Sequence, residues 1–278
     1  MSNQLQHVKS AALSLAANKT RSALTMLGIS IGVLAVTLLV SVGEGAKSSV
    51  ETSLTSIGTN LLSVVPGRIE AQGFGYLGAA VRKPLVIEDS ELLERQATHL
   101  AAVTPVVLGN ASIQFAGRAR STNIFGVGPR FLDVRNIRLE SGSFLSSEDI
   151  AARRRVVILG RTLVDSILDG KPAIGSSVRV GGERFRVVGV TERKGRSLGI
   201  DLDDMALVPV SVAAEFFEQT SLNQILAAAK SDTDAELASQ QIDELLAGRR
   251  RGERSFTIQT QDDLLRVFDS ITSAMSWT

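Results

Sequence analysis

Few residues in this sequence have types that could do chemistry, and their spacing completes no recognisable site. Gly73, Gly75 and Gly78 match the letters of the dinucleotide-binding fingerprint, Gly-x-Gly-x-x-Gly. In a true nucleotide site these glycines directly follow a strand and open a helix, and an acidic residue that binds the ribose comes later. The surrounding sequence offers neither feature, so we expect a loop that binds no cofactor.

Candidate metal ligands are equally sparse. Asp201, Asp203 and Asp204 could offer carboxylate oxygens to calcium, but the spacing, the glycine and the closing glutamate of an EF-hand are absent. We expect a solvated turn there. The only histidines are His7 and His99, which are expected on opposite sides of a membrane, and no cysteine is present to bind zinc or form a disulfide. We therefore predict no metal site and no catalytic residue.

Charge and motif content also restrict the classes of partner. No Gly-x-x-x-x-Gly-Lys-Ser/Thr loop occurs, so ATP hydrolysis would have to come from another protein. The 30 Lys and Arg residues nearly balance 29 Asp and Glu, and a net charge of +1 gives no field to gather nucleic acid. The arginine runs at 153–155 and 249–251 are interpreted as solvated loop charges, with lipid headgroup contact as the alternative. We predict that the chain is not an enzyme and does not bind nucleic acid.

The strongest signal in the sequence is an uncharged apolar stretch near the N-terminus. No charged residue lies between Arg21 and Glu44, and 11 of the residues from Leu24 to Val42 are Leu, Ile or Val. About 20 helical residues cross the roughly 30 Å hydrocarbon core of a bilayer. The stretch therefore predicts a transmembrane helix at residues 22–43. The alternatives are a cleaved signal peptide, whose apolar region is shorter, and a buried helix of a soluble protein.

Flanking charges predict the orientation of this span. Lys9, Lys19 and Arg21 precede it without any acidic residue, whereas Glu44 and Glu51 follow it. The positive-inside rule then places the N-terminus in the cytoplasm and everything after Gly43 outside. Residues 1–21 carry apolar residues at helical spacing, which predicts a cytoplasmic amphipathic leader along the membrane surface or, alternatively, a frayed tail.

Two glycines in the span are candidate packing residues. Gly28 and Gly32 form a Gly-x-x-x-Gly pair, which lets two helix backbones approach closely in lipid. The pair is common by chance, so a second copy of the chain, a neighbouring helix and no partner at all remain open.

The rest of the chain predicts an α+β class: one transmembrane helix followed by an extracytoplasmic mixed α/β domain with a β-rich insert. Tight turns are expected at Gly109-Asn110 and Gly181-Gly182. Helices are expected at residues 87–100, 212–219 and 233–247. Strands are expected at residues 60–65, 103–108, 111–116, 123–127, 155–159, 177–180, 185–190, 206–210, 224–229 and 256–259. The predicted segments after the span are a stalk helix at 44–58, an α/β half at 59–121, a β-rich subdomain at 122–205, a second α/β half at 206–259 and a return stalk helix at 260–278.

Several ordered motifs together resemble one family. The chain is similar to the MacB-like and FtsX-type permeases of ABC transporters, and the resemblance covers nearly its whole length. The motifs are Ser14 to Arg21, Leu24 to Val33, Gly43 to Ala46, Ile57 to Leu61, Pro66-Gly67, Gly126-Val127, Val156 to Gly160, Ile174-Gly175, Val187 to Val190 and Val208-Pro209.

This resemblance implies a function that the residues alone do not. It implies an inner-membrane permease subunit that couples ATP hydrolysis by a cytoplasmic ABC ATPase to periplasmic movement, a mode called mechanotransmission, for substrate export or extraction. It also implies a second permease copy, a periplasmic adaptor, membrane lipid as a partner, and three further spans after Thr278. The alternative is a membrane-tethered binding or signalling module that recruits an envelope enzyme.

The predicted orientation can be tested by cysteine labelling in intact cells. A cysteine placed at Ser147 should react with a membrane-impermeant thiol reagent, whereas a cysteine at Ser2 should react only after the cells are permeabilised. Labelling of Ser2 alone in intact cells would reverse the assignment.

Overall fold

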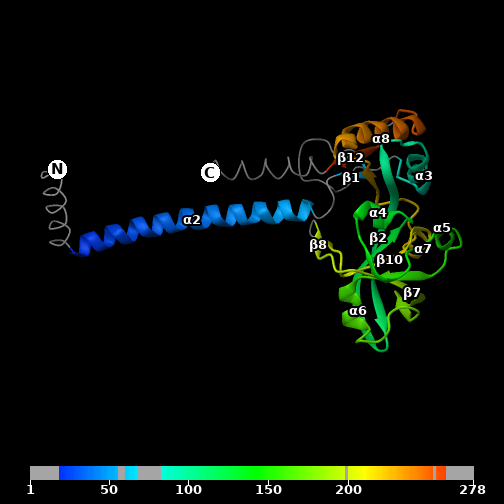
Figure 1. Cartoon of the computed structure of the whole chain (residues 1–278), viewed down its shortest axis with the longest axis horizontal. Helices are drawn as coiled ribbons and strands as arrows, with labels where there is room; N and C mark the ends of the chain where they lie inside the picture. The colour runs from blue at the N-terminus through cyan, green and yellow to red at the C-terminus, as the bar shows by residue number, and fades with distance from the viewer. Residues whose placement is uncertain (1–18, 56–59, 68–82, 198–199, 253–254, 261–278) are drawn as a thin grey trace. The chain divides into compact units, whose positions relative to one another are not determined.

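The computed structural model describes residues 19–55, 60–67, 83–197, 200–252 and 255–260 (Figure 1). The chain divides between Thr52 and Ser53 into two compact units, which we describe separately. The first unit contains most of helix α2 (Lys19–Thr55), and the second contains the sheet and the remaining helices. The predicted leader, the Gly73 to Gly78 loop and the return helix lie outside the described residues.

Helix α2 joins two predicted elements. The helix has 37 residues, about 55 Å at 1.5 Å per residue, and the part from Lys19 to Gly43 is long and apolar enough to cross a membrane. None of its most apolar window is buried inside the structure. The Thr37 hydroxyl donates to the Val33 carbonyl at 2.8 Å, so this polar side chain is satisfied within the helix. The predicted span and most of the predicted stalk thus form one unbroken helix.

The second unit is built on a ten-stranded sheet. Its strands follow the order β12-β1-β11-β2-β3-β10-β5-β7-β4, and β6 pairs with both β2 and β7. Most pairs are antiparallel, but β10 with β3 and β5 with β7 are parallel. The strands are β1 (Leu61–Pro66), β2 (Leu100–Phe115), β3 (Arg118–Val127), β4 (Leu139–Gly142), β5 (Val156–Leu159), β6 (Ser177–Val180), β7 (Glu183–Thr191), β10 (Met205–Pro209), β11 (Gln224–Ala229) and β12 (Phe256–Thr260), with a separate pair of β8 (Arg196–Ser197) and β9 (Ile200–Asp201).

Hydrophobic cores lie on both faces of this sheet. Successive side chains of a strand point to opposite faces, and the neighbours Ala102 and Val103 of β2 accordingly belong to two different buried clusters. Helices α3, α6, α7 and α8 contribute to one cluster, and α4 contributes to the other. The helices are α3 (Ile87–Gln96), α4 (Phe131–Arg135), α5 (Ser147–Ala151), α6 (Arg161–Ile167), α7 (Val210–Phe216), the 3-10 turn η1 (Asp232–Asp234) and α8 (Ala235–Arg249).

The predicted fold class is confirmed: one N-terminal apolar helix precedes a mixed α/β domain rich in strands. Strands β6 and β11 have the predicted bounds, and the turn between β6 and β7 is formed by Gly181 and Gly182, both with positive φ. Helix α3 ends at Gln96 rather than at Leu100, because Leu100 begins β2. Strands β4, β8 and β9 and the short helices α4, α5 and α6 were not predicted. The division of the domain into two halves and an insert stays a prediction.

The predicted turn at Gly109-Asn110 is wrong. Strand β2 runs straight through this pair, with Gly109 opposite Ile124 in β3. A Cβ atom on Gly109 would lie 2.2 Å from the ring of Phe217, so the glycine makes room for an aromatic side chain instead of forming a turn. The turn that joins β2 to β3 lies at Ala116 and Gly117, whose φ values of 49° and 85° fit a two-residue hairpin loop.

The role of Gly109 predicts a non-additive pair of substitutions. Gly109→Ala should destabilise the protein by about 1 to 3 kcal/mol, because the added methyl group overlaps the Phe217 ring. In a Phe217→Leu background the cost of Gly109→Ala should fall to less than half, measured by chemical denaturation of the four variants of the cycle. An equal cost in both backgrounds would remove Phe217 as the reason for the glycine.

Candidate functional site

The strand that follows the apolar helix pairs directly with the last described strand of the chain. Only residues 56–59 separate the end of α2 from Asn60, and β1 begins at Leu61. Strand β12 ends at Thr260, which lies opposite Leu62 in the antiparallel pair with β1. The first and the last strand described in this unit are therefore adjacent, and they are labelled beside each other in Figure 1. We call β12, β1 and β11 the junction strands.

Hydrogen bonds hold β1 on both sides. The Ala229 amide of β11 donates to the Asn60 carbonyl at 2.9 Å, and the Ser63 hydroxyl donates to the Gln224 side chain at 3.0 Å. On the other side, the Thr257 hydroxyl of β12 donates to the Gly67 carbonyl at 2.8 Å. Strand β1 is thus an interior strand, and a displacement of β1 has to move its neighbours or break these bonds.

The side chains of the junction strands are anchored in the core. Leu62 and Val64 of β1 have no exposed surface and belong to the same buried cluster as Ile242 and Leu246 of α8. Completely burying such an aliphatic side chain stabilises a protein by roughly 1.5 to 3 kcal/mol. The packing therefore fixes β1 to α8 as well as to its neighbouring strands.

A buried ion pair lies beside the junction strands. The Arg250 guanidinium, which follows α8, donates to the Asp89 carboxylate of α3 at 2.7 Å, and both residues are less than a tenth exposed. The same guanidinium also donates to the Lys83 carbonyl at 3.0 Å, to the Pro84 carbonyl at 3.1 Å and to the Ser255 hydroxyl at 2.7 Å, just before β12. One arginine thus ties the ends of α8, α3 and β12 together.

This finding corrects the interpretation of the run 249–251 as solvated charges at one of its three residues. Arg250 is buried, whereas Arg249 and Arg251 are exposed, and the Arg249 Nε atom lies 3.1 Å from Asp89. The other run follows the prediction: Arg153, Arg154 and Arg155 lie at the surface and pair with nearby acidic side chains, which are Glu215, Glu148, Asp149 and Glu183. The sequence gives no local signal for the difference, because the partner of Arg250 lies 161 residues away.

The aspartates considered as calcium ligands form hydrogen bonds and ion pairs within the protein instead. The Asp203 carboxylate accepts hydrogen bonds from the backbone amides of Lys194 at 2.7 Å and Gly195 at 3.0 Å. Asp204 pairs with Arg120 through two hydrogen bonds, and this contact raises the pKa of Arg120 above its ordinary value. The predicted turn is present, but Asp203 is buried rather than solvated. No group of three metal-ligating side chains occurs within the described residues.

The nearby Lys194 side chain anchors this turn to α4. Its ammonium group donates to the carbonyls of Arg135 and Asn136 at the C-terminal end of α4, where the helix dipole favours a positive charge. Burial lowers the pKa of Lys194, and the neighbouring Arg135 lowers it further. The interaction is structural, since both acceptors are backbone carbonyls.

The remaining candidates are His99 and the two glycines of the apolar helix. His99 contacts Asp234 at 3.1 Å, and the pKa of Asp234 is lowered mainly by a hydrogen bond from Ser231 and then by His99. Gly28 and Gly32 lie one turn apart on α2, and a Cβ atom added to either would meet no described atom within 4 Å. Both glycines are therefore open to a neighbouring helix, and their packing role stays a prediction.

Comparison with known proteins shows which family has this architecture. Residues 22–245 match the family model of the MacB-like periplasmic core domain. The chain is 32% identical over 270 residues to the macrolide export ATP-binding/permease protein MacB 1/2 of Paracoccus denitrificans, which covers 97% of this chain and 40% of that protein. It is 34% identical over 274 residues to MacB of Hyphomonas neptunium, covering 98% of this chain and 42% of that protein. The chain thus spans about two fifths of these relatives.

Two solved structures share the fold. The periplasmic region of MacB from Actinobacillus actinomycetemcomitans superposes with a TM-score of 0.64 at 23% identity, over 78% of this chain and 95% of that one. The extracellular domain of the noncanonic ABC-type transporter YknZ from Gram-positive bacteria gives a TM-score of 0.59 at 13% identity, over 72% of this chain and 100% of that one. At these identities the likeness supports the fold alone.

The buried ion pair predicts a large and specific loss of stability. Asp89→Asn should lower the free energy of unfolding by about 3 kcal/mol or more, because it leaves the Arg250 guanidinium buried without its counter-charge. Glu91→Gln is the matched control: this carboxylate also lies on α3 and pairs with Arg95, but both side chains are at least half exposed, so the cost should stay within about 1 kcal/mol. Denaturant titration of the full chain in detergent measures the free energy of unfolding of both variants. Similar losses in the two variants would contradict a stabilising role of the buried Asp89–Arg250 pair.

Proposed function

The chain belongs to the MacB-like periplasmic core domain family, and on this premise we propose that it is the N-terminal part of an ABC transporter permease that transmits movement from a cytoplasmic ATPase to its periplasmic domain. The single observation that carries the proposal is mechanical. The apolar helix α2 continues without a break to Thr55, and the strand that follows it is hydrogen-bonded inside the sheet on both edges.

A continuous helix transmits displacement better than a loop does, because its backbone hydrogen bonds resist bending. About 12 residues of α2 follow Gly43, the end of the apolar span, which corresponds to roughly 18 Å of helix. Movement of the span would be carried along this stalk and through residues 56–59 to β1. The junction strands would then move together, since β1 cannot shift alone.

The proposal assigns partners and a location to the chain. The chain lies in the inner membrane, with its N-terminus in the cytoplasm and its sheet domain in the periplasm. ATP is hydrolysed by a separate or fused ATPase domain, because the sequence has no phosphate-binding loop. A second permease copy, a periplasmic adaptor and lipid complete the assembly, and Gly28 and Gly32 are offered as the surface where α2 meets another helix. The transported substrate lies in the periplasm or the outer leaflet.

The stalk mechanism can be tested in the complete permease with its ATPase. Replacing residues 47–50 by four glycines keeps the length and register of α2 but costs about 1 kcal/mol of helix stability per residue relative to alanine. The matched control replaces the same residues by four alanines. We expect both variants to hydrolyse ATP, and only the four-alanine variant to export substrate.

Two outcomes would overturn parts of this proposal. Equal export by the glycine and alanine variants would exclude a rigid stalk while leaving the permease assignment in place. Copurification of the complete protein with an envelope hydrolase, together with unchanged substrate accumulation in a deletion strain, would favour a membrane-tethered recruiting module instead.

A further inference from the structure

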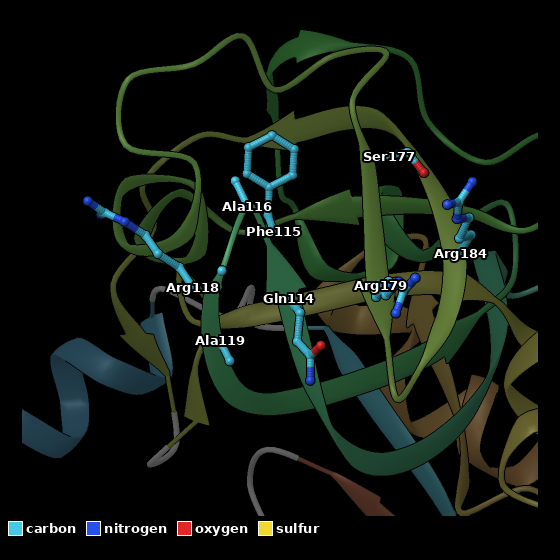
Figure 2. Close-up of a pocket in the computed structure, with 9 residues that line it drawn as sticks. Gln114, Phe115, Ala116, Arg118, Ala119, Ser177, Arg179 and Arg184 are labelled. Atoms are coloured by element: carbon cyan, nitrogen blue, oxygen red, sulfur yellow. The ribbon is translucent and has the colours of Figure 1, made fainter.

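At the end of the sheet away from the junction strands, three neighbouring strands place polar side chains in one row. Gln114 of β2 lies opposite Arg179 of β6, and Arg179 lies opposite Arg184 of β7. Residues directly opposite each other in a sheet project from the same face. Both arginines are exposed, whereas Val178, which precedes Arg179, is buried in the core. The row therefore lies on the outer surface of the sheet, as Figure 2 shows.

A hollow of about 620 Å³ opens along this row. It lies between the hairpin of β2 and β3 and the hairpin of β6 and β7, and its volume is in the range of small-molecule sites. The side chains that line it include Gln114, Phe115, Arg118, Ser177, Arg179 and Arg184. In Figure 2 the tip of Arg184 lies beside Ser177, the tip of the neighbouring Arg179 points the other way, and Arg118 lies on the other side of Phe115.

The two facing arginines are unfavourable for the folded protein by themselves. Like charges directly opposite each other on two strands destabilise a sheet. The nearby carboxylates are engaged elsewhere: Asp169 pairs with Arg118 at 2.6 Å, and Glu183 pairs with Arg155 at 3.0 Å. Among the described residues, no carboxylate forms an ion pair with Arg179 or Arg184. In the part of the chain that the structure describes, this surface thus holds two adjacent positive charges without a carboxylate partner.

We propose that this hollow binds a ligand through a phosphate group held between Arg179 and Arg184. A guanidinium presents a planar fork of donors that matches phosphate and carboxylate oxygens in pairs. A carboxylate has two oxygens and can satisfy one fork, whereas a phosphate group has enough oxygens and negative charge for both. The Ser177 hydroxyl and the Gln114 amide add uncharged donors. The inference does not rest on the transport function.

Inorganic pyrophosphate is a suitable first probe. Titrated into the full chain in detergent, it should bind with one site per chain by calorimetry. Arg179→Gln and Arg184→Gln should each weaken binding at least tenfold. Both variants are expected to melt no lower than the parent, because each substitution removes a like-charge contact, so a loss of binding cannot be attributed to unfolding.

The matched control is Arg186→Gln. Arg186 lies two residues from Arg184 on the same exposed face of β7 and carries the same charge, but it does not line the hollow. This variant should weaken binding less than twofold. A loss equal to that of Arg184→Gln would mean diffuse attraction to a basic surface, and it would overturn the site, as would the absence of binding at millimolar pyrophosphate.

Two further probes separate the sources of the phosphate group. Short-chain phosphatidic acid that binds more tightly than pyrophosphate would identify a lipid headgroup as the ligand, and the reverse order would identify a soluble phosphate compound. Citrate supplies comparable negative charge through carboxylates alone. Tighter binding of citrate than of both phosphate probes would overturn the assignment of a phosphate site.

Discussion

Strand β1 is hydrogen-bonded along both edges, to β11 on one side and to β12 on the other, and its inward side chains are completely buried. This double pairing joins distant parts of the sequence, because β12 comes from the end of the described chain, almost 200 residues after β1. The junction strands can form only when the whole intervening sequence has folded back to bring the two together. Arg250 contributes to the same long-range closure, because its guanidinium donates both to Ser255, just before β12, and to the carbonyls of Lys83 and Pro84 before α3. The strand that follows the apolar helix α2 is thus held by long-range contacts rather than by local structure.

Local features of the chain could be predicted from the sequence because their causes are local. The apolar stretch that forms α2 needs no partner within the sheet domain, and the two glycines between β6 and β7 adopt the positive φ values that their hairpin requires. Helices α4, α5 and α6 could not be recognised in the same way. They have five to seven residues each, which leaves at most two turns for a helical period to show, and the equally short α7 was predicted only with its bounds displaced by two to three residues.

The errors of prediction share a different cause, which is a partner distant in the sequence. Gly109 looked like a turn residue beside Asn110, yet it is glycine because Phe217 packs against it. Arg250 looked like one of three solvated arginines, yet Asp89 neutralises it in the core. Asp203 looked like a solvated turn residue, yet it caps the amides of residues 194 and 195. In each case the residue type was compatible with both structures, and only the tertiary contact decided between them.

The long strand β2 physically connects the two regions that we assign to function. Its first half pairs with β11, which pairs in turn with β1, and its second half pairs with β6 and carries Gln114 into the arginine-lined hollow. A strand of 16 residues is about 50 Å long, and burial on both faces restricts its sideways movement along much of that length. A shift of the junction strands therefore has to be taken up either between β11 and β2 or by β2 as a whole. Because the pair of β11 with β2 is continuous except for one irregularity beside Ala229, movement of β2 as a unit disrupts fewer hydrogen bonds than separation of the strands does.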